Sequence, residues 1–361
     1  MQDDERKREQ AGKPATMKDI AVHLGVSINT VHKAVTGKPG VSDAVRAKIL
    51  AYAEERGYRR NMEASALRRR ETVISACLPA LTAESSFFYG HVWDGCRAYA
   101  DELRSQGIRM VEDAYEEGRF DRMLEAIVRR VEAGRRLDGL LTIPPRGRDA
   151  RAMLERLADL GVCIVFVSGD EPEAAGRYGA VMADFEVAGM LMAEQARNLL
   201  PRGGRILLMA GDAFKDSHYR VARSLHEGIA RYGDGFQIHD LYGYRDRERL
   251  RADVEGELKE GGVDLVCCVF ARGGATLREA LTSTGRAGKV PVIASDVFDE
   301  TVAGMRDGVF TNLVYKDPRG QAYRAMQMLG EHLLLGRDPE QRVVSSEVSL
   351  VFQSTLPYFL R

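Results

Sequence analysis

TMKDIAVHLGVSINTVHKAV, the stretch at residues 16–35, decides the fold of the amino-terminal part of the chain. Thr16 supplies a hydroxyl and Asp19 a carboxylate three residues later, which is the form of a capping box at a helix start. Apolar residues then recur at helical spacing until Gly25 ends the helix. Ser27 is a preferred N-cap for a second helix. Two short helices joined by a glycine turn are therefore predicted.

The contact between these two helices has a recognisable spacing. Helices that cross steeply need a small residue where they touch, a glycine in the turn and a branched apolar anchor. Ala21, Gly25 and Val31 supply these at intervals of four and six residues. The spacing predicts a helix-turn-helix, although it also arises by chance in unrelated helices.

The flanks complete this small module. Residues 1–15 are charged, carry no periodicity and are expected to form a disordered tail. Residues 37–40, Gly-Lys-Pro-Gly, break the second helix. Ser42 is expected to cap a third helix that runs to Gly57.

From Thr72 onward, short apolar runs alternate with amphipathic stretches. This alternation predicts parallel, doubly wound sheets with helices on both faces, and there are too many strands for one sheet. Two similar lobes are therefore expected. The expected strands lie at 73–78, 108–111, 137–143, 162–167, 205–209, 263–270 and 290–294.

Charge is divided unevenly along the chain. Residues 1–70 hold 15 Lys and Arg against 9 Asp and Glu, a net charge of +6, while the remainder holds 37 against 44, a net charge of -7. A basic end on an acidic chain favours a head that binds a polyanion.

The head resembles that of the LacI/GalR family of transcription regulators. The resemblance rests on residues 17–35, on Gly-Val-Ser at 40–42, on Gly-Tyr at 57–58, and on the Asn-x-x-Ala-x-x-Leu spacing of residues 61–67. It implies DNA binding by a helix-turn-helix and a hinge helix. The DNA-binding residues that it implies are Thr16, Ser27, Ile28, Asn29, Thr30, His32, Lys33, Asn61, Ala64 and Leu67.

Within this set, the resemblance implies separate roles. Ile28 and Asn29 would open the recognition helix toward base edges, Ser27 and Thr30 would lie near phosphate, and Lys33 would reach deeper. Asn can pair with adenine and Lys with guanine acceptors. The family usually has serine and arginine where this chain has His32 and Lys33. Lys cannot form the bidentate fork of Arg, so the operator need not match the family's common one.

The segment Asn61–Arg70 has two interpretations. It is either a basic linker without a ligand or, by resemblance, a hinge helix whose Leu67 wedges between base steps of the minor groove while Ala64 allows two hinges to pack. Unstacking a step costs on the order of a few kcal/mol, which the contacts to bent DNA offset. Two such heads match a pseudo-palindromic operator, so a homodimer or a tetramer is expected.

The remainder, to about residue 357, resembles the periplasmic sugar-binding fold that the family carries as its effector domain. The ligand would lie between the lobes, at the carboxyl ends of the strands. Three crossovers between lobes are expected, near 168–184, 295–296 and 315–317. The resulting organisation is a tail at 1–15, a helix-turn-helix domain at 16–60, a hinge at 61–71, and a two-lobed effector-binding and dimerisation domain at 72–361, with lobe one at about 72–168 and 316–340 and lobe two at about 185–312.

Several residues of this part are expected to bind the effector. Phe87 and Phe88 resemble the aromatic rings that stack on a sugar, although each could equally fill the core. Asp296, after an apolar run, takes the place of a carboxylate that grips sugar hydroxyls. Asp184 could bind ligand or cap a helix, and Lys316 stands where the family has glutamine.

Departures from the family suggest an unusual effector. Leu225 stands where the family places an arginine, but Arg220 and Arg223 lie close to it, and Arg272 follows the strand at 263–270. Together with Lys316 they add positive charge. Arginine recognises carboxylates and phosphates bidentately, so a sugar acid or phosphorylated sugar is a reasonable hypothesis.

Two other functional classes compete with this interpretation. An enzyme would need a nucleophile with its base or a metal cluster, but the seven histidines are scattered and no H-E-x-x-H, G-x-S-x-G or P-loop motif occurs. A sugar-binding transport receptor would fit the body but not the head. The five cysteines contain no C-x-x-C, so we expect no metal and no cofactor. The first residues resemble no signal peptide and no long apolar run follows, so a cytoplasmic protein without membrane contact is expected.

Overall fold

The computed structural model describes residues 15–35, 40–56, 58, 71–82, 85–233, 235–243 and 246–360. They form two compact units, one mainly within residues 1–70 and the other mainly within residues 71–361. The smaller unit, called the head below, is helical, and the larger one contains two sheets with helices. This confirms the expected fold class.

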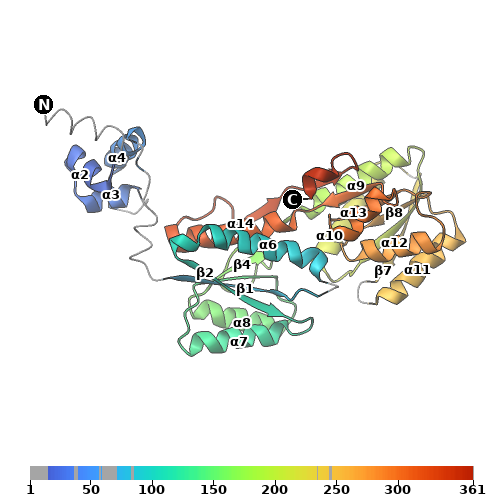
Figure 1. Cartoon of the computed structure of the whole chain (residues 1–361), viewed down its shortest axis with the longest axis horizontal. Helices are drawn as coiled ribbons and strands as arrows, with labels where there is room; N and C mark the ends of the chain where they lie inside the picture. The colour runs from blue at the N-terminus through green and yellow to red at the C-terminus, as the bar shows by residue number, and fades with distance from the viewer. Residues whose placement is uncertain are drawn as a thin grey trace. The chain divides into compact units, whose positions relative to one another are not determined.

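In the described part of the head there are three helices, namely α2 (Met17–Leu24), α3 (Ile28–Val35) and α4 (Asp43–Glu55) (Figure 1). Ala21 and Val31 are both buried, as their spacing predicts. Ser42 takes the N-cap position of α4, but its side chain makes no capping bond, so that expectation was wrong. The expected tail lies outside the described residues except for Ala15. The buried head core consists of Ile20, Ala21, Val31, Ala34, Ile49 and Ala53.

Lobe one has a six-stranded sheet in which all strands are parallel. Helices α6 (Ser86–Glu102) and α14 (Pro318–Leu335) cover one face, and α7 (Phe120–Glu132) and α8 (Arg148–Asp159) cover the other (Figure 1). A short 3-10 helix, η2 (Arg104–Gln106), follows α6. The strand order is β11 (Val343–Ser346), β5 (Arg177–Ala183), β4 (Cys163–Val167), β3 (Gly139–Thr142), β1 (Thr72–Pro79) and β2 (Ile108–Tyr115).

Lobe two repeats this plan with one antiparallel strand at its edge. The strand order is β12 (Ser349–Val351), β10 (Asn312–Tyr315), β9 (Val292–Ser295), β8 (Leu265–Cys268), β6 (Gly204–Gly211) and β7 (Phe236–Tyr242). Its helices are α9 (Phe185–Leu199), α10 (Asp216–Ala230), α11 (Arg247–Glu260), α12 (Gly273–Ser283), α13 (Asp299–Arg306) and the 3-10 helix η3 (Leu356–Phe359). Central strands such as β8 and β9 are buried along their whole length, as parallel strands between two helical layers should be.

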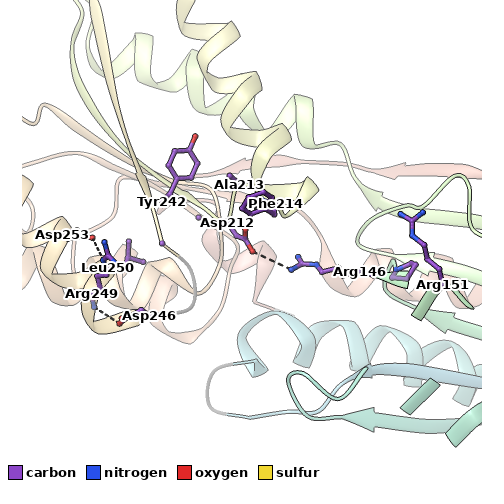
Figure 2. A pocket seen from close by; sticks show the side chains of 14 residues that line it. Arg146, Arg151, Asp212, Ala213, Phe214, Tyr242, Asp246, Arg249, Leu250 and Asp253 are labelled. Atoms are coloured by element: carbon purple, nitrogen blue, oxygen red, sulfur yellow. Dashed lines mark hydrogen bonds and ion pairs between the residues drawn. The ribbon is translucent and has the colours of Figure 1, made fainter. Parts of the chain in front are cut away.

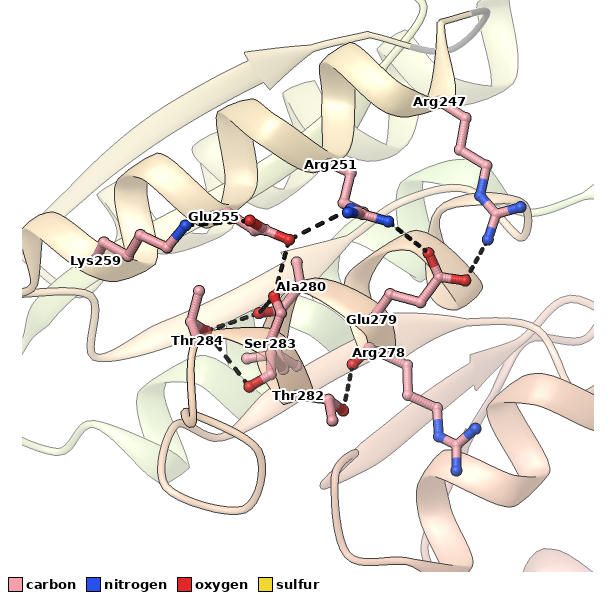
Figure 3. A network of polar contacts seen from close by, with 11 residues as sticks. Arg247, Arg251, Glu255, Lys259, Arg278, Glu279, Ala280, Thr282, Ser283 and Thr284 are labelled. Carbon is pink, nitrogen blue, oxygen red and sulfur yellow. Dashed lines mark hydrogen bonds and ion pairs between the residues drawn. The ribbon is translucent and has the colours of Figure 1, made fainter.

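Charged side chains tie α11 to α12 on the surface of lobe two (Figure 3). Glu255 accepts hydrogen bonds from Ser283 Oγ at 2.8 Å and from Lys259 Nζ at 3.2 Å, and Arg251 lies between Glu255 and Glu279. The bond from Ser283, with the nearby cations, lowers the pKa of Glu255. The network therefore keeps Glu255 charged and holds the two helices together.

The chain crosses between the lobes at places that differ partly from those expected. It crosses after β5 at Asp184, between β10 and α14 at residues 316–317, and between β11 and β12 at residues 347–348. Residues 295–296 are not a crossover, because β9 and β10 pair within one sheet. Lobe one therefore extends past residue 168 to include β5, and past residue 340 to include β11. The last crossover was missed because β11 and β12 are very short.

Among the described residues, three other than glycine have left-handed backbone conformations, Ser168 with φ of 61°, Asp296 with φ of 63° and Asp317 with φ of 50°. Each follows the carboxyl end of a strand, respectively β4, β9 and β10. Such a conformation costs on the order of 1 kcal/mol or more for a residue with a side chain, and it persists where the surroundings impose it. The strain lies where a parallel sheet presents its ligand site.

Candidate functional site

Local hydrogen bonds fix the start of α2 and the start of α3, and a glycine forms the turn between these helices. The Thr16 amide donates to Asp19 Oδ2 at 2.8 Å, and the Asp19 amide donates to Thr16 Oγ1 at 3.3 Å, which forms the predicted capping box. Gly25 ends α2 with φ of 62°, a conformation that glycine adopts without strain. The Thr30 amide then donates to Ser27 Oγ at 3.0 Å and so caps α3.

The first turn of α3 faces solvent. Ile28 is 51% exposed, and Ser27 and Asn29 are also exposed. Thr30, His32 and Lys33 are half-buried, farther along the helix. Helix α3 carries no acidic residue, and its uncovered amino-terminal turn attracts anions. This arrangement allows α3 to approach the phosphate backbone of DNA and to present the side-chain amide of Asn29 and the ammonium group of Lys33 to the DNA.

Sequence reasoning missed Arg46, which holds the other end of α3. Its Nη1 donates to the carbonyl oxygens of Lys33 at 3.1 Å and Ala34 at 2.9 Å. A cation at a helix carboxyl end satisfies free carbonyls and the helix dipole. Arginine three residues into a neighbouring helix gives no sequence signal for this contact, because it depends on how α4 packs on α3. The hinge residues Asn61, Ala64 and Leu67 lie outside the described residues.

In the larger unit, aromatic rings meet between the lobes. Phe87, at the start of α6 in lobe one, lies with its ring centroid 5.1 Å from that of Phe298 in lobe two. Phe88 instead packs against the core of lobe one, with its ring edge toward Tyr89. Of the two predicted stacking residues, Phe87 alone takes part in this contact between the lobes.

Asp296 and Lys316 form a buried ion pair at the carboxyl ends of β9 and β10. Asp296 Oδ2 lies 3.0 Å from Lys316 Nζ, and Asp296 Oδ1 accepts from the Lys316 amide at 3.2 Å. Lys316 Nζ also donates to Ser295 Oγ at 3.0 Å. The two side chains expected to bind the effector thus bind each other.

The backbone of Lys316 joins further elements at this point. Its carbonyl oxygen accepts from Gln321 Nε2 at 2.6 Å and from Ser346 Oγ at 3.3 Å. Ser346 ends β11, so one residue connects two of the three crossovers. This polar cluster therefore lies where two of the connections between the lobes meet.

Other predicted effector residues have structural partners. Asp184 caps α9 by accepting from the Val187 amide at 3.0 Å, the alternative interpretation given for it. Arg220 pairs with Glu186 at 2.6 Å, and Arg223 lies 3.5 Å from the same carboxylate. Arg272 lies half-buried at the N-cap position of α12. Arg220 and Arg223 therefore link α10 to α9.

A pocket of about 910 Å³ lies between the lobes (Figure 2). Arg146 and Arg151 line it from lobe one, in the segment that follows β3. From lobe two, Asp212 approaches Arg146, with 3.8 Å between Oδ2 and Nη1. The remaining lining residues are Pro145, Gly147, Gly211, Ala213, Phe214, Tyr242, Gly243, Asp246, Arg249, Leu250 and Asp253.

Cations crowd this region, which shifts the titration of two neighbouring groups. Burial and the charges of Arg146 and Lys316 lower the pKa of Lys215 to about 8. Burial and the charge of Lys215 hold the pKa of His218 well below its usual range. His218 Nδ1 accepts from the Asp212 amide at 3.1 Å, as a neutral imidazole can. Sequence reasoning named neither Arg146 nor Lys215, because no motif marks the loops that carry them.

Comparison with known proteins relates both units to families. Residues 16–61 match the bacterial regulatory proteins of the lacI family, and residues 80–338 match the periplasmic binding protein domain. The chain joins a lacI-family head to a body of the periplasmic binding protein family. Among curated relatives, it is 28% identical over 159 residues to the HTH-type transcriptional regulator DegA of Bacillus subtilis (strain 168), which is 44% of each chain. It is 31% identical over 129 residues to the ribose operon repressor of Escherichia coli (strain K12), which is 36% of this chain and 37% of the relative. The alignments with these two relatives therefore span less than half of their lengths.

Solved structures support the fold of the larger unit. An ABC transporter solute-binding protein from Burkholderia graminis, in complex with D-arabinose, aligns with a TM-score of 0.69 and 19% identity, over 81% of this chain and 99% of that one. This likeness shows the fold alone. Within the part of the chain that the structure describes, no helix is long and apolar enough to span a membrane.

Proposed function

We propose that this LacI-family protein is a transcriptional repressor whose affinity for operator DNA is controlled by a small carbohydrate-like effector bound between its lobes. The observation that carries the proposal is the family match over residues 16–61, on a head whose α3 presents its amino-terminal turn to solvent. Membership of a family of regulators, not of enzymes, argues against a catalytic role. Binding to operator DNA implies action in the cytoplasm.

The effector acts by linkage between two sites. An effector that prefers one arrangement of the lobes shifts the protein toward it, and operator affinity changes reciprocally. The Lys316 cluster supports this proposal, since it joins two crossovers and lies at the strand ends of the lobe-two sheet. A homodimer or a tetramer would place two heads on a pseudo-palindromic operator.

The first test concerns base readout by Lys33. The wild-type chain selects its operator from random DNA, and band-shift assays then give affinities for the selected and for scrambled sequences. Lys33→Ala should lower affinity for the selected operator by about 1–3 kcal/mol, because a base contact is lost, and should lower non-specific affinity much less. Lys48→Ala, an exposed lysine of α4, is the matched control and should affect both sequences alike. Equal losses for Lys33→Ala on both sequences would contradict the assignment.

The second test concerns the hinge. Leu67→Ala should weaken binding to the selected operator and leave non-specific binding nearly unchanged, since wedging between base steps occurs only on the specific site. The same band-shift assays measure both quantities, and operator bending can be followed by energy transfer between dyes at the DNA ends. A wild-type degree of bending in Leu67→Ala would refute the wedge.

A further inference from the structure

The two walls of the interlobe pocket differ in chemistry. The lining residues from lobe one include Arg146 and Arg151 and no acidic side chain among the described residues. Lobe two contributes the carboxylates Asp212, Asp246 and Asp253, the guanidinium of Arg249 and two exposed aromatic rings. The rings belong to Phe214, which is 97% exposed, and Tyr242, which is 58% exposed. A ligand that fills this pocket meets arginine donors on the lobe-one wall, and three carboxylates with one arginine on the lobe-two wall.

The two arginines of the lobe-one wall are not equivalent. Arg151 is held by Glu171, with 2.7 Å between Nη2 and Oε2. Arg146 is half-exposed, and among the described residues its guanidinium makes no hydrogen bond, since Asp212 lies 3.8 Å from it. Asp212 uses its other oxygen to accept from the Phe214 amide at 2.9 Å. Arg146 can therefore offer a planar pair of donors to a ligand.

Asp296, the carboxylate expected to bind sugar hydroxyls, is already occupied. Asp296 accepts a hydrogen bond from the Lys316 amide and forms an ion pair with Lys316 Nζ, which also donates to Ser295 Oγ. This buried pair is electrically neutral as a unit. Beside the pocket, Arg146 and Lys215 carry positive charge close to the carboxylate of Asp212.

We propose that the effector is a polyhydroxy compound with one oxyanion group, a carboxylate or a phosphate, bound by Arg146. The anion lies against the lobe-one wall, the hydroxyls donate to Asp212 and Asp246, and an apolar face of the ligand rests on Phe214 or Tyr242. Bidentate binding of an oxyanion by arginine is strong and directional, so it draws the two lobes together on the ligand. This inference rests on the proposed function, in which the cleft holds the effector.

The test uses matched sets of ligands on the full chain. For each of several hexoses, thermal shift and calorimetric titration compare the neutral sugar, its uronic acid and its 6-phosphate. The best acid or phosphate should bind about 10- to 100-fold more tightly than its neutral counterpart, as expected for hydrogen bonds to a charged group. The acid and phosphate arms distinguish the two sources of charge.

Two arginine variants test which residue binds the anionic group of the ligand. Arg146→Gln should remove the preference for the anionic member of a pair, whereas Arg148→Gln, an exposed arginine two residues away that does not line the pocket, should retain it. Equal affinity for neutral and anionic members, the same loss in both variants, or no binding of any anionic member at about 10 mM would overturn the proposal.

The number of protons taken up on binding gives a second readout, separate from the affinity. Charged and titratable groups surround Lys215 from several elements. They are Arg146 on the loop after β3, Asp212 after β6, His218 in α10, Asp296 after β9 and Lys316 after β10. Because the pKa of Lys215 is lowered to about 8, a bound anion raises it, so binding takes up protons near pH 8 and weakens as pH rises above that value. Calorimetry at pH 8 in two buffers of different ionisation enthalpy measures this uptake, and zero uptake would count against the anion site.

Band-shift assays separate this inference from the proposed function. If the chain binds a selected operator but prefers neutral sugars, the proposed function stands and the anion site fails. If anionic ligands bind through Arg146 but no DNA sequence is selected, the anion site stands and the repressor assignment fails.

Discussion

Lys316→Met is expected to lower the free energy of unfolding of the two-lobed unit by about 3–5 kcal/mol, because it leaves Asp296 buried without its counter-charge. Asp296 is 2% exposed and Lys316 is 7% exposed, so water cannot replace the lost partner. Methionine fills nearly the same volume as the lysine stem, which separates loss of charge from loss of packing. Urea unfolding followed by the fluorescence of Trp93, the single tryptophan, measures the change.

The double variant Lys316→Met with Asp296→Asn is the control for this experiment. It removes both charges together and should recover much of the stability, since neutral or apolar replacement of a whole buried pair costs far less than breaking it. The carboxamide that Asp296→Asn introduces can still accept from the amide of residue 316. If the single and double variants unfolded at the same urea concentration, the ion pair would not be the source of the effect.

Val31→Asp is expected to abolish operator binding by unfolding the head while the larger unit retains its melting temperature. Val31 is fully buried at the centre of the three helices, and the head core has only six buried apolar residues among those that the structure describes. An unpaired carboxylate there costs several kcal/mol, which is comparable with the whole stability of a domain of this size. Amide spectra report the loss of the head, and calorimetric melting reports the larger unit.

Val22→Asp is the matched control for Val31→Asp. Val22 lies in the same head on α2 and is 76% exposed, so the new carboxylate stays in water and the head should remain folded. Loss of head structure in both variants, or in neither, would contradict the burial on which the prediction depends. A lower melting temperature of the larger unit in Val31→Asp would show that the two units do not unfold independently.

Signals within a few residues of each other made the head predictable. Thr16 and Asp19 form the capping box expected of them, and Gly25 adopts the left-handed turn that its position requires. A capping partner that comes from another helix leaves no local pattern in the sequence. Arg46 of α4, which binds the carbonyl oxygens at the end of α3, was therefore missed. Ser42 is the opposite case: it occupies the N-cap position of α4, but its side chain makes no capping hydrogen bond.

The cleft was predictable in position but not in its contacts. The strand pattern indicated which loops lie at the carboxyl ends, and Arg146, Asp212 and Asp296 are all found there. That Asp296 binds Lys316 could not be foreseen, because the two are 20 residues apart and meet only after β9 and β10 pair. Arg146 and Asp212 come from different lobes, so their approach depends on how the whole unit closes.

The placement of β11 has a consequence for how the protein is made. Val343 of β11 pairs with Ala180 of β5, so the sheet of lobe one stays unfinished until the chain has been synthesised past residue 346. The head core extends only from Ile20 to Ala53 and uses local contacts, which form early and quickly. During synthesis the head can therefore reach its native shape well before the two-lobed unit in which we propose the effector binds.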